Sequence, residues 1–134
     1  LKGRWQQLAD NPRIICDIGH NEGGIRELIN CLSEEYQKKP FRRLYWVLGM
    51  VSDKDIEKVL ALLPKEAYYF FCQASIPRAL DAEELARRAS RYELCGEVIR
   101  EVNQAIEQAK KRSNSDDLIL VAGSTFMVAE ITSL

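Results

Sequence analysis

The chain has 134 residues, of which 46% are hydrophobic and 29% are charged, which is typical of a globular domain and excludes a disordered chain. This length suits one domain with a sizeable core, and no linker, repeat or low-complexity tract divides the sequence. The net charge of -1, without a dense block of Lys and Arg, argues against a nucleic-acid partner, and no apolar run approaches the roughly 20 residues of a membrane span.

The first third of the chain alternates between strand and helix patterns. Residues 4–8 (RWQQL) predict an edge strand, and residues 13–17 (RIICD) predict a buried strand that ends in a glycine-rich turn. Apolar residues then recur at steps of three and four from Ile25 to Tyr36. This spacing predicts an amphipathic helix, which Pro40 ends.

The middle third repeats the alternation. Residues 44–49 (LYWVLG) predict a second buried strand. Ser52 or Asp53 is placed to cap the helix that follows, whose apolar residues run from Ile56 to Leu63. Residues 67–72 (AYYFFC) predict a third strand, because aromatic residues favour β-structure.

The last third begins with a short helix, predicted over residues 82–88 and capped by Asp81. Residues 92–95 predict a brief strand. Apolar residues spaced from Val98 to Ala109 then predict a long helix, whose basic end suits the helix dipole.

Residues 118–122 (LILVA) predict the last strand, and Ser124 or Thr125 begins a terminal helix. Strands that are apolar throughout, alternating with amphipathic helices, predict a parallel sheet that helices cover on both faces. Residues 1–134 are therefore predicted to form a single doubly wound, Rossmann-like α/β domain with a mostly parallel sheet.

Polar turns follow four of the predicted strands. They are residues 17–24 (DIGHNEGG), 49–55 (GMVSDKD), 72–80 (CQASIPRAL) and 122–126 (AGSTF). Ligands of doubly wound sheets bind beyond the carboxyl ends of the strands, so we expect these turns to converge on one rim. The first turn delivers an acid, Asp17, and the only histidine in the chain, His20, to that rim.

Each candidate residue of these turns also fits a structural role. Asp17 could simply end a strand, and His20 with Asn21 could cap a helix. Ser124 fits a helix N-cap as well as a catalytic hydroxyl. A Ser-His triad is not favoured, because it would have to use the single histidine, His20.

Two cations near the rim each have two interpretations, and the solvated one is favoured for Lys54. Lys54 could touch an anion or could be a solvated lysine at a helix start. Arg78 follows the stiff Pro77, and its guanidinium could fork onto a ligand carboxylate or form a surface ion pair. Neither a G-x-G-x-x-G loop nor a G-x-x-x-x-G-K-[ST] loop occurs in the sequence.

Five short motifs occur in one order along nearly the whole chain. They are Gly3-Arg4, Asp17-Ile18-Gly19-His20-Asn21-Glu22, Gly49 with Asp53-Lys54-Asp55, Pro77-Arg78-Ala79, and Gly123-Ser124. In this order and spacing, the motifs resemble the C-terminal domain of the folylpolyglutamate synthase/dihydrofolate synthase branch of the Mur ligase family.

The resemblance implies a ligase that uses ATP and Mg²⁺ to join L-glutamate to the carboxylate of folate or dihydropteroate through an acyl phosphate. By the same resemblance, Arg4 and Asp17 would contact ATP. His20 and Ser124 would serve in glutamate handling or catalysis. Arg78 would read a carboxylate of the incoming amino acid.

The sequence also departs from the family pattern. Ile18 and Gly19 replace the usual Gly-Ala, and Glu22 replaces Pro, so the path of this turn is in question. The family's phosphate loop and Mg²⁺ ligands belong to an N-terminal ATPase domain, which would be the partner of this domain within one chain. The start at Leu1 instead of Met fits a fragment, which we expect to be inactive alone.

Two other functions stay open. The chain could belong to another Mur-type amino-acid ligase, or it could be a non-catalytic, flavodoxin-like ligand-binding module.

Cys16 and Cys72 lie inside apolar runs, which favours buried reduced thiols. The four cysteines form no C-x-x-C pair and the chain has one histidine, so a structural zinc site is not favoured. The first residues, LKGRWQQLADNP, contain no signal-peptide core. We therefore expect a cytoplasmic protein with no metal ligands of its own and with no membrane partner.

Overall fold

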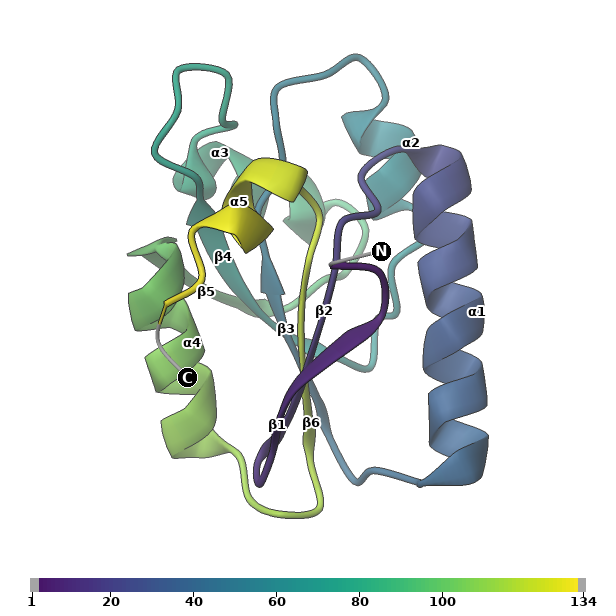
Figure 1. Ribbon diagram of the computed structural model, residues 1–134. Helices are drawn as coiled ribbons and strands as arrows, with labels where there is room; N and C mark the ends of the chain where they lie inside the picture. The colour runs from purple at the N-terminus through teal and green to yellow at the C-terminus, as the bar shows by residue number, and fades with distance from the viewer. Residues whose placement is uncertain (1–2, 133–134) are drawn as a thin grey trace.

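The computed structural model describes residues 3–132, which fold into a central sheet with helices on both faces (Figure 1). Within this part of the chain the sheet has six strands in the order β1-β2-β6-β3-β4-β5. The strands are β1 (Gln6–Asp10), β2 (Arg13–Asp17), β3 (Leu44–Leu48), β4 (Tyr68–Gln73), β5 (Gly96–Glu101) and β6 (Leu118–Ala122). Only the pairing of β1 with β2 is antiparallel, and the others are parallel, so the predicted fold class is confirmed.

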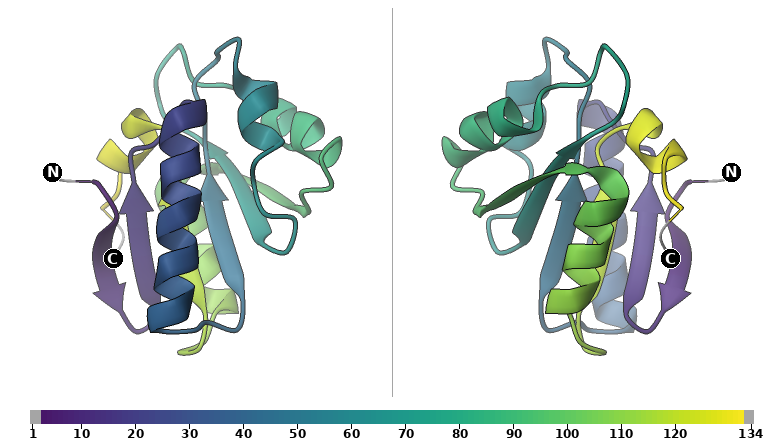
Figure 2. Two further views of the ribbon diagram at one scale, coloured as in Figure 1. Left: turned by 90° about the vertical axis from the view of Figure 1, so that its right-hand side faces the viewer. Right: turned by 90° about the vertical axis from the view of Figure 1, so that its left-hand side faces the viewer.

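The helices divide between the two faces of the sheet. They are α1 (Glu22–Lys38), α2 (Ile56–Leu60), α3 (Ala82–Ser90), α4 (Val102–Arg112) and α5 (Thr125–Ala129). The first three pack on one face and the last two on the other, and Figure 2 shows α1 and α4 on opposite sides of the sheet. None of the helices within residues 3–132 has the length and apolarity that a membrane span requires.

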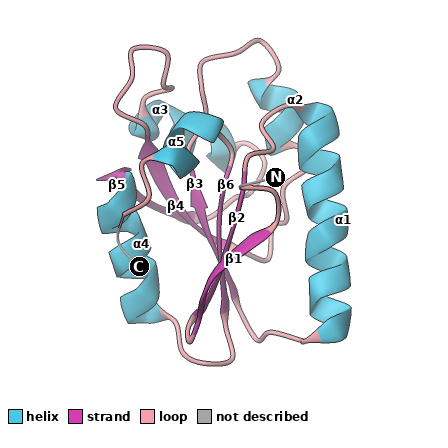
Figure 3. Cartoon of the chain, viewed as in Figure 1, coloured by secondary structure: helices cyan, strands magenta, loops and turns pink. Residues whose placement is uncertain are grey.

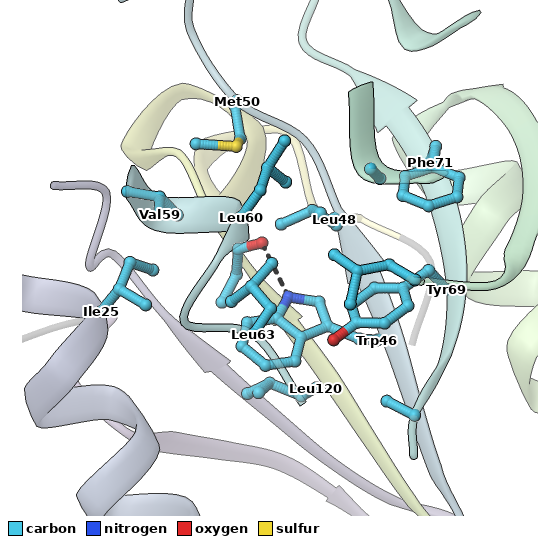
Figure 4. Packing of buried hydrophobic residues seen from close by; sticks show 14 of the residues in the cluster. Ile25, Trp46, Leu48, Met50, Val59, Leu60, Leu63, Tyr69, Phe71 and Leu120 are labelled. Carbon is cyan, nitrogen blue, oxygen red and sulfur yellow. Dashed lines mark hydrogen bonds between the residues drawn. The ribbon is translucent and has the colours of Figure 1, made fainter. Parts of the chain in front are cut away.

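Buried side chains on both faces explain why the central strands read as continuous apolar runs. Trp46 of β3 lies at the centre of the larger core, where its ring stacks on Tyr69 of β4 with the ring centroids 5.8 Å apart (Figure 4). The indole Nε1 donates a hydrogen bond of 3.1 Å to the carbonyl of Ala122, so the buried polar atom is satisfied. The core therefore fixes β3, β4 and β6 against one another.

Several predicted elements are confirmed. The four central strands occupy the predicted runs, and Asp81 caps α3 with hydrogen bonds of 3.1 Å from the N–H groups of Glu83 and Glu84. The edge strand is present as β1, two residues later than predicted, because the chain is still turning at Trp5. Cys16 and Cys72 are buried free thiols, as predicted.

The prediction for residues 92–95 is wrong, because a turn follows α3 there and the strand is β5, which begins at Gly96. Gly96 lies so close to β4 that an added Cβ would meet the carbonyl oxygen of Tyr69 at 2.0 Å. Val98 consequently belongs to β5 and not to the long helix. Helix α4 begins at Val102, where Glu101 caps it. A mostly polar edge strand carries a weak apolar signal, because it is only partly buried.

The predicted cap of the middle helix is also wrong. Helix α2 is a short helix that begins at Ile56, and neither Ser52 nor Asp53 caps it. The Asp53 carboxylate instead accepts a hydrogen bond of 3.1 Å from the N–H of Asp55, which forms a turn before the helix. The preceding residues are held by another loop, because the N–H of Ser52 donates to the carbonyl of Arg78 at 2.7 Å.

A buried ion pair joins the amino-terminal end of β2 to α1. The Arg13 side chain is only 4% exposed and lies 2.8 Å from a carboxylate oxygen of Glu35. Its second nitrogen donates to the carbonyl of Lys39 at 2.9 Å. The other oxygen of Glu35 accepts a hydrogen bond of 3.3 Å from the indole of Trp5. Glu35 therefore links three segments that are distant in sequence.

Replacing Glu35 with Ala should lower the free energy of unfolding by about 3 kcal/mol, because the Arg13 guanidinium would stay buried without its carboxylate. Urea denaturation of the 134-residue chain measures this. The neighbouring Glu34 is exposed on the same helix, so Glu34→Ala is the matched control and should change stability by less than about 0.5 kcal/mol. Equal losses in the two variants would contradict the role of the ion pair.

Candidate functional site

The turns singled out in the sequence gather at the carboxyl edge of the sheet, where the loops after β3 and β4 rise above the strands (Figure 3). Two neighbouring pockets open there. The first, called the β2 pocket, has a volume of about 410 Å³ and is lined by Arg4, Trp5, Asp17, Ile18, Gly19, His20, Asn21, Gly24, Glu27, Leu28 and Cys31. The second, called the Arg78 pocket, has about 300 Å³ and is lined by His20, Val51, Asp53, Arg78, Ser124, Thr125 and Phe126. His20 lines both pockets.

Asp17 is the last residue of β2 and is only 6% exposed. One carboxylate oxygen accepts a hydrogen bond of 2.8 Å from the N–H of Trp5, and the other accepts one of 2.7 Å from the N–H of Gly19. Trp5 has a φ of 41°, which is uncommon for a bulky residue, and the bond to Asp17 holds it in that conformation. Asp17 thus fixes both the loop that carries Arg4 and the turn that carries His20.

The turn after β2 accounts for the departures from the family pattern. An added Cβ at Gly19 would lie 2.9 Å from the carbonyl oxygen of Gly24, so glycine suits the close approach of the turn to α1. The side chain of Ile18 packs against Gly3. Glu22 begins α1, where a carboxylate suits the helix dipole, and it pairs with Arg26 at 3.0 Å.

His20 and Asn21 have different roles. Asn21 caps α1, since its side-chain oxygen accepts a hydrogen bond of 2.8 Å from the N–H of Gly24. His20 is exposed and takes no part in the cap. Its Nδ1 lies 3.2 Å from the carbonyl of Ile18. A carbonyl can only accept, so this bond requires the proton on Nδ1 and leaves Nε2 of the neutral ring as an acceptor.

Ser124 caps α5, which confirms its structural role. It is 2% exposed, and its Oγ accepts hydrogen bonds of 3.1 Å and 3.4 Å from the N–H groups of Phe126 and Met127. The preceding Gly123 has a φ of 131°, and an added Cβ there would meet the carbonyl oxygen of Gly49 at 2.3 Å. The ends of β3 and β6 can therefore touch only because glycine stands at this position.

Arg78 lies on a loop that is fastened to the loop after β3. The N–H of Ser52 donates to the carbonyl of Arg78 at 2.7 Å, and the N–H of Leu80 donates to the carbonyl of Met50 at 2.9 Å. A β-bridge between Val51 and Ala79 lies between these two bonds. This pair of loops is called the loop clamp below.

Two carboxylates fasten the Arg78 loop at its ends. Glu130, just after α5, accepts a hydrogen bond of 2.6 Å from the N–H of Ser75. Asp81 accepts one of 2.6 Å from Arg100, and this hydrogen bond holds the pKa of Asp81 below its usual value. The loop is thus held along its length.

The Arg78 guanidinium itself has no ion-pair partner among residues 3–132, so the alternative of a surface ion pair is not supported. Lys54 is exposed and lines neither pocket. Arg4, by contrast, lines the β2 pocket with a half-exposed side chain 3.5 Å from a carboxylate oxygen of Glu27. The structure therefore brings Arg4, Asp17 and His20 together in one pocket, and His20, Arg78 and Ser124 together in the other.

The β2 pocket offers the Arg4 cation, the His20 imidazole, the Glu27 carboxylate and a thiol, Cys31. Burial, reinforced by nearby carboxylates including that of Glu34, raises the pKa of the Cys31 thiol, so this thiol stays protonated at neutral pH and is a poor nucleophile. Across residues 3–132, no group of three His, Cys, Asp or Glu side chains is placed to hold a metal ion.

Sequence reasoning missed some of the residues that line the site. Asp53 stands in the Asp-Lys-Asp motif, from which the sequence predicts no ligand contact for it, yet it lines the Arg78 pocket. Phe126 lies at the mouth of the same pocket with 46% of its surface exposed. The sequence signal that could have identified Phe126 is its place two residues after Ser124, within the stretch 122–126 that follows the last strand.

Replacing Asp17 with Ala should lower the free energy of unfolding by roughly 2–3 kcal/mol, because two partly buried N–H groups would lose their acceptor. Thermal or urea denaturation of the 134-residue chain measures the loss. His20→Ala, which removes an exposed side chain from the same turn, is the control and should stay within about 0.5 kcal/mol of the wild type. Wild-type stability in Asp17→Ala would show that the carboxylate does not hold the turn.

Comparison with known proteins identifies the family. Residues 3–125 match the family model "Mur ligase, glutamate ligase domain". A relative from Halobacterium salinarum, a probable bifunctional folylpolyglutamate synthase/dihydropteroate synthase, is 33% identical over 132 residues, which cover 96% of this chain and 15% of the relative.

Solved structures give the same result. Escherichia coli FolC in complex with DHPP and ADP superposes with a TM-score of 0.84 at 30% identity, over 96% of this chain and 30% of that one. A bifunctional folylpolyglutamate synthase/dihydrofolate synthase with Mn, AMPPNP and L-glutamate bound gives a TM-score of 0.81 at 30% identity, with the same two coverages, 96% and 30%.

The chain thus spans between 15% and 30% of the length of these relatives. The resemblance seen in the five motifs is confirmed at the level of the family. Because the family model covers almost all of the described residues, the protein belongs to the Mur ligase family, of which it forms the glutamate ligase domain.

Proposed function

We propose that this chain is the C-terminal domain of a cytoplasmic folylpolyglutamate synthase/dihydrofolate synthase, a ligase that uses ATP to join L-glutamate to the carboxylate of folate or dihydropteroate. The observation that carries the proposal is the pair of adjacent pockets that share His20. One pocket offers the Arg4 cation and the other offers the Arg78 cation. The two solved relatives hold a nucleotide, and one also holds L-glutamate. Two anionic ligands of this kind would suit two adjacent pockets that each offer a cation.

The reaction requires three anionic substrates to meet: ATP, the folate or dihydropteroate carboxylate, and L-glutamate. A carboxylate is a poor electrophile, so its oxygen first takes the γ-phosphoryl group of ATP, and ADP leaves. The amine of glutamate then attacks the carbonyl carbon of the acyl phosphate, and phosphate leaves as the amide bond forms. A domain that holds the nucleotide beside the amino acid serves this sequence by positioning and by excluding water.

In this scheme Arg4 contacts the nucleotide from the β2 pocket, where its half-exposed guanidinium is free to reorient. Asp17 acts mainly by position, because both of its oxygens already accept backbone hydrogen bonds. His20 lies where the two pockets meet, and its Nε2 is the proposed contact to glutamate or to the group in transfer.

The Arg78 pocket would hold glutamate. A guanidinium without a protein carboxylate can bind a ligand carboxylate with two parallel hydrogen bonds. Both lone pairs of the Ser124 hydroxyl are occupied by the α5 cap, so Ser124 retains only its own hydrogen to offer. We therefore assign Ser124 the role of a hydrogen-bond donor to glutamate and not that of a nucleophile.

The remaining machinery is proposed to lie on an N-terminal ATPase domain of the same protein. That domain would supply the phosphate loop and the ligands of Mg²⁺, as the resemblance to the ligase family implies. Bound Mg²⁺ would neutralise charge on the transferring phosphoryl group. The carboxyl edge of the present domain would face that nucleotide.

In the full-length protein, His20→Ala should lower kcat/KM by ten- to a thousandfold, or roughly 1.4–4 kcal/mol of transition-state stabilisation. The melting temperature should hardly change, because the side chain is exposed. Release of ADP in the presence of L-glutamate and dihydropteroate measures turnover. Lys38→Ala, at the far end of α1, is the control and should behave as the wild type. Near-normal turnover by His20→Ala would remove His20 from the mechanism.

The 134-residue chain alone should bind its ligands weakly and should catalyse no ligation, because it lacks a phosphate loop. Incubation with ATP, dihydropteroate and L-glutamate, followed by chromatography of the folate products, tests this. The full-length protein serves as the positive control. Ligation by the chain alone would contradict the division of labour between the two domains.

A further inference from the structure

The Arg78 pocket contains the carboxylate of Asp53, to which the proposed function assigns no role. Asp53 lines this pocket with Arg78, although the two residues are far apart in sequence. The loop clamp brings them together, because the bond from the Ser52 N–H to the Arg78 carbonyl, 2.7 Å long, involves the neighbour of Asp53. The wall of the pocket therefore carries one cation and one anion.

The Asp53 carboxylate is only partly used by the protein. One oxygen accepts the hydrogen bond of 3.1 Å from the N–H of Asp55 that forms the turn before α2. No side-chain cation of residues 3–132 pairs with Asp53, and Lys58 of α2 lies beside Asp55 instead, at 4.0 Å. The second oxygen of Asp53 is thus free to accept a hydrogen bond from a ligand.

We propose that Asp53 binds the α-ammonium group of the incoming amino acid while Arg78 binds a carboxylate of the same molecule. This inference rests on the proposed function, because it concerns the glutamate pocket of that ligase. A zwitterion matches the two unpartnered charges that line this pocket. A charge-assisted hydrogen bond between a carboxylate and an ammonium group is among the stronger polar contacts.

The chemistry of the ligase gives this contact a purpose. A pocket with Arg78 alone would accept any small dicarboxylate, including glutarate, which lacks the amine and cannot attack an acyl phosphate. Asp53 would reject such compounds, because a ligand without an ammonium group leaves the carboxylate without a partner. The ammonium form has no lone pair and must lose a proton before attack. The contact therefore belongs to the bound ground state and should affect KM more than kcat.

The test is Asp53→Asn in the full-length protein. Asparagine keeps the side-chain oxygen that accepts the Asp55 N–H, so the turn is preserved while the charge is removed. KM for L-glutamate should rise by about tenfold, with kcat changed by less than about threefold. The preference for L-glutamate over glutarate is the ratio of the inhibition constant of glutarate to KM for L-glutamate. This ratio should fall by a similar factor. KM for ATP should stay at the wild-type value.

Asp55→Asn is the matched control, since it removes the same charge from the same loop outside the pocket. An unchanged preference in Asp53→Asn, or an equal loss in Asp55→Asn, would overturn the assignment. Should Asp53→Asn melt early, Asp53→Ser takes its place, because a hydroxyl can also accept the Asp55 N–H. The wild-type protein separates the two proposals. If the wild type releases no ADP in response to glutamate, the proposed function is refuted. If the wild type releases ADP normally and Asp53→Asn keeps the wild-type preference for glutamate, only this inference is refuted.

Discussion

The carboxylate of Asp17 is the interaction on which both pockets depend. It lies at the end of a buried strand and accepts N–H groups from Trp5 and Gly19, which belong to segments on opposite sides of it in sequence. A nearly buried carboxylate with fixed donors is rigid, so the loop that carries Arg4 and the turn that carries His20 have one common reference point. The relative placement of the two pockets follows from this.

The second pocket depends on how closely the strand ends approach one another. Gly123 lets the backbone after β6 touch the carbonyl of Gly49 after β3, where a Cβ would meet the oxygen at 2.3 Å. The loop clamp then joins the loop after β3 to the loop after β4 with backbone hydrogen bonds and the bridge between Val51 and Ala79. Because backbone groups join the two loops, the side chains of Asp53 and Arg78 are not used to hold them together and can line the pocket.

At this edge, residues of the candidate site also have structural roles. Asn21 and Ser124 each begin a helix by capping it, and each belongs to one of the five short motifs of the sequence. A capping residue is held in place by the backbone that it caps, so its polar atom has a fixed position. Ser124 shows the consequence, because a hydroxyl whose lone pairs are occupied can act only as a donor.

The sequence by itself determined the layered fold and the edge where the site lies, because continuous apolar strands between amphipathic helices allow few arrangements other than a covered parallel sheet. It also placed His20, Arg78 and Ser124 among the candidates through short motifs. Tertiary structure alone decided that β5 is a strand and that Val98 belongs to it, since a partly buried edge strand has little apolar pattern of its own. It alone placed Asp53 and Arg78 in the lining of one pocket, because the loop clamp consists of backbone hydrogen bonds, which leave no trace in the identity of the side chains.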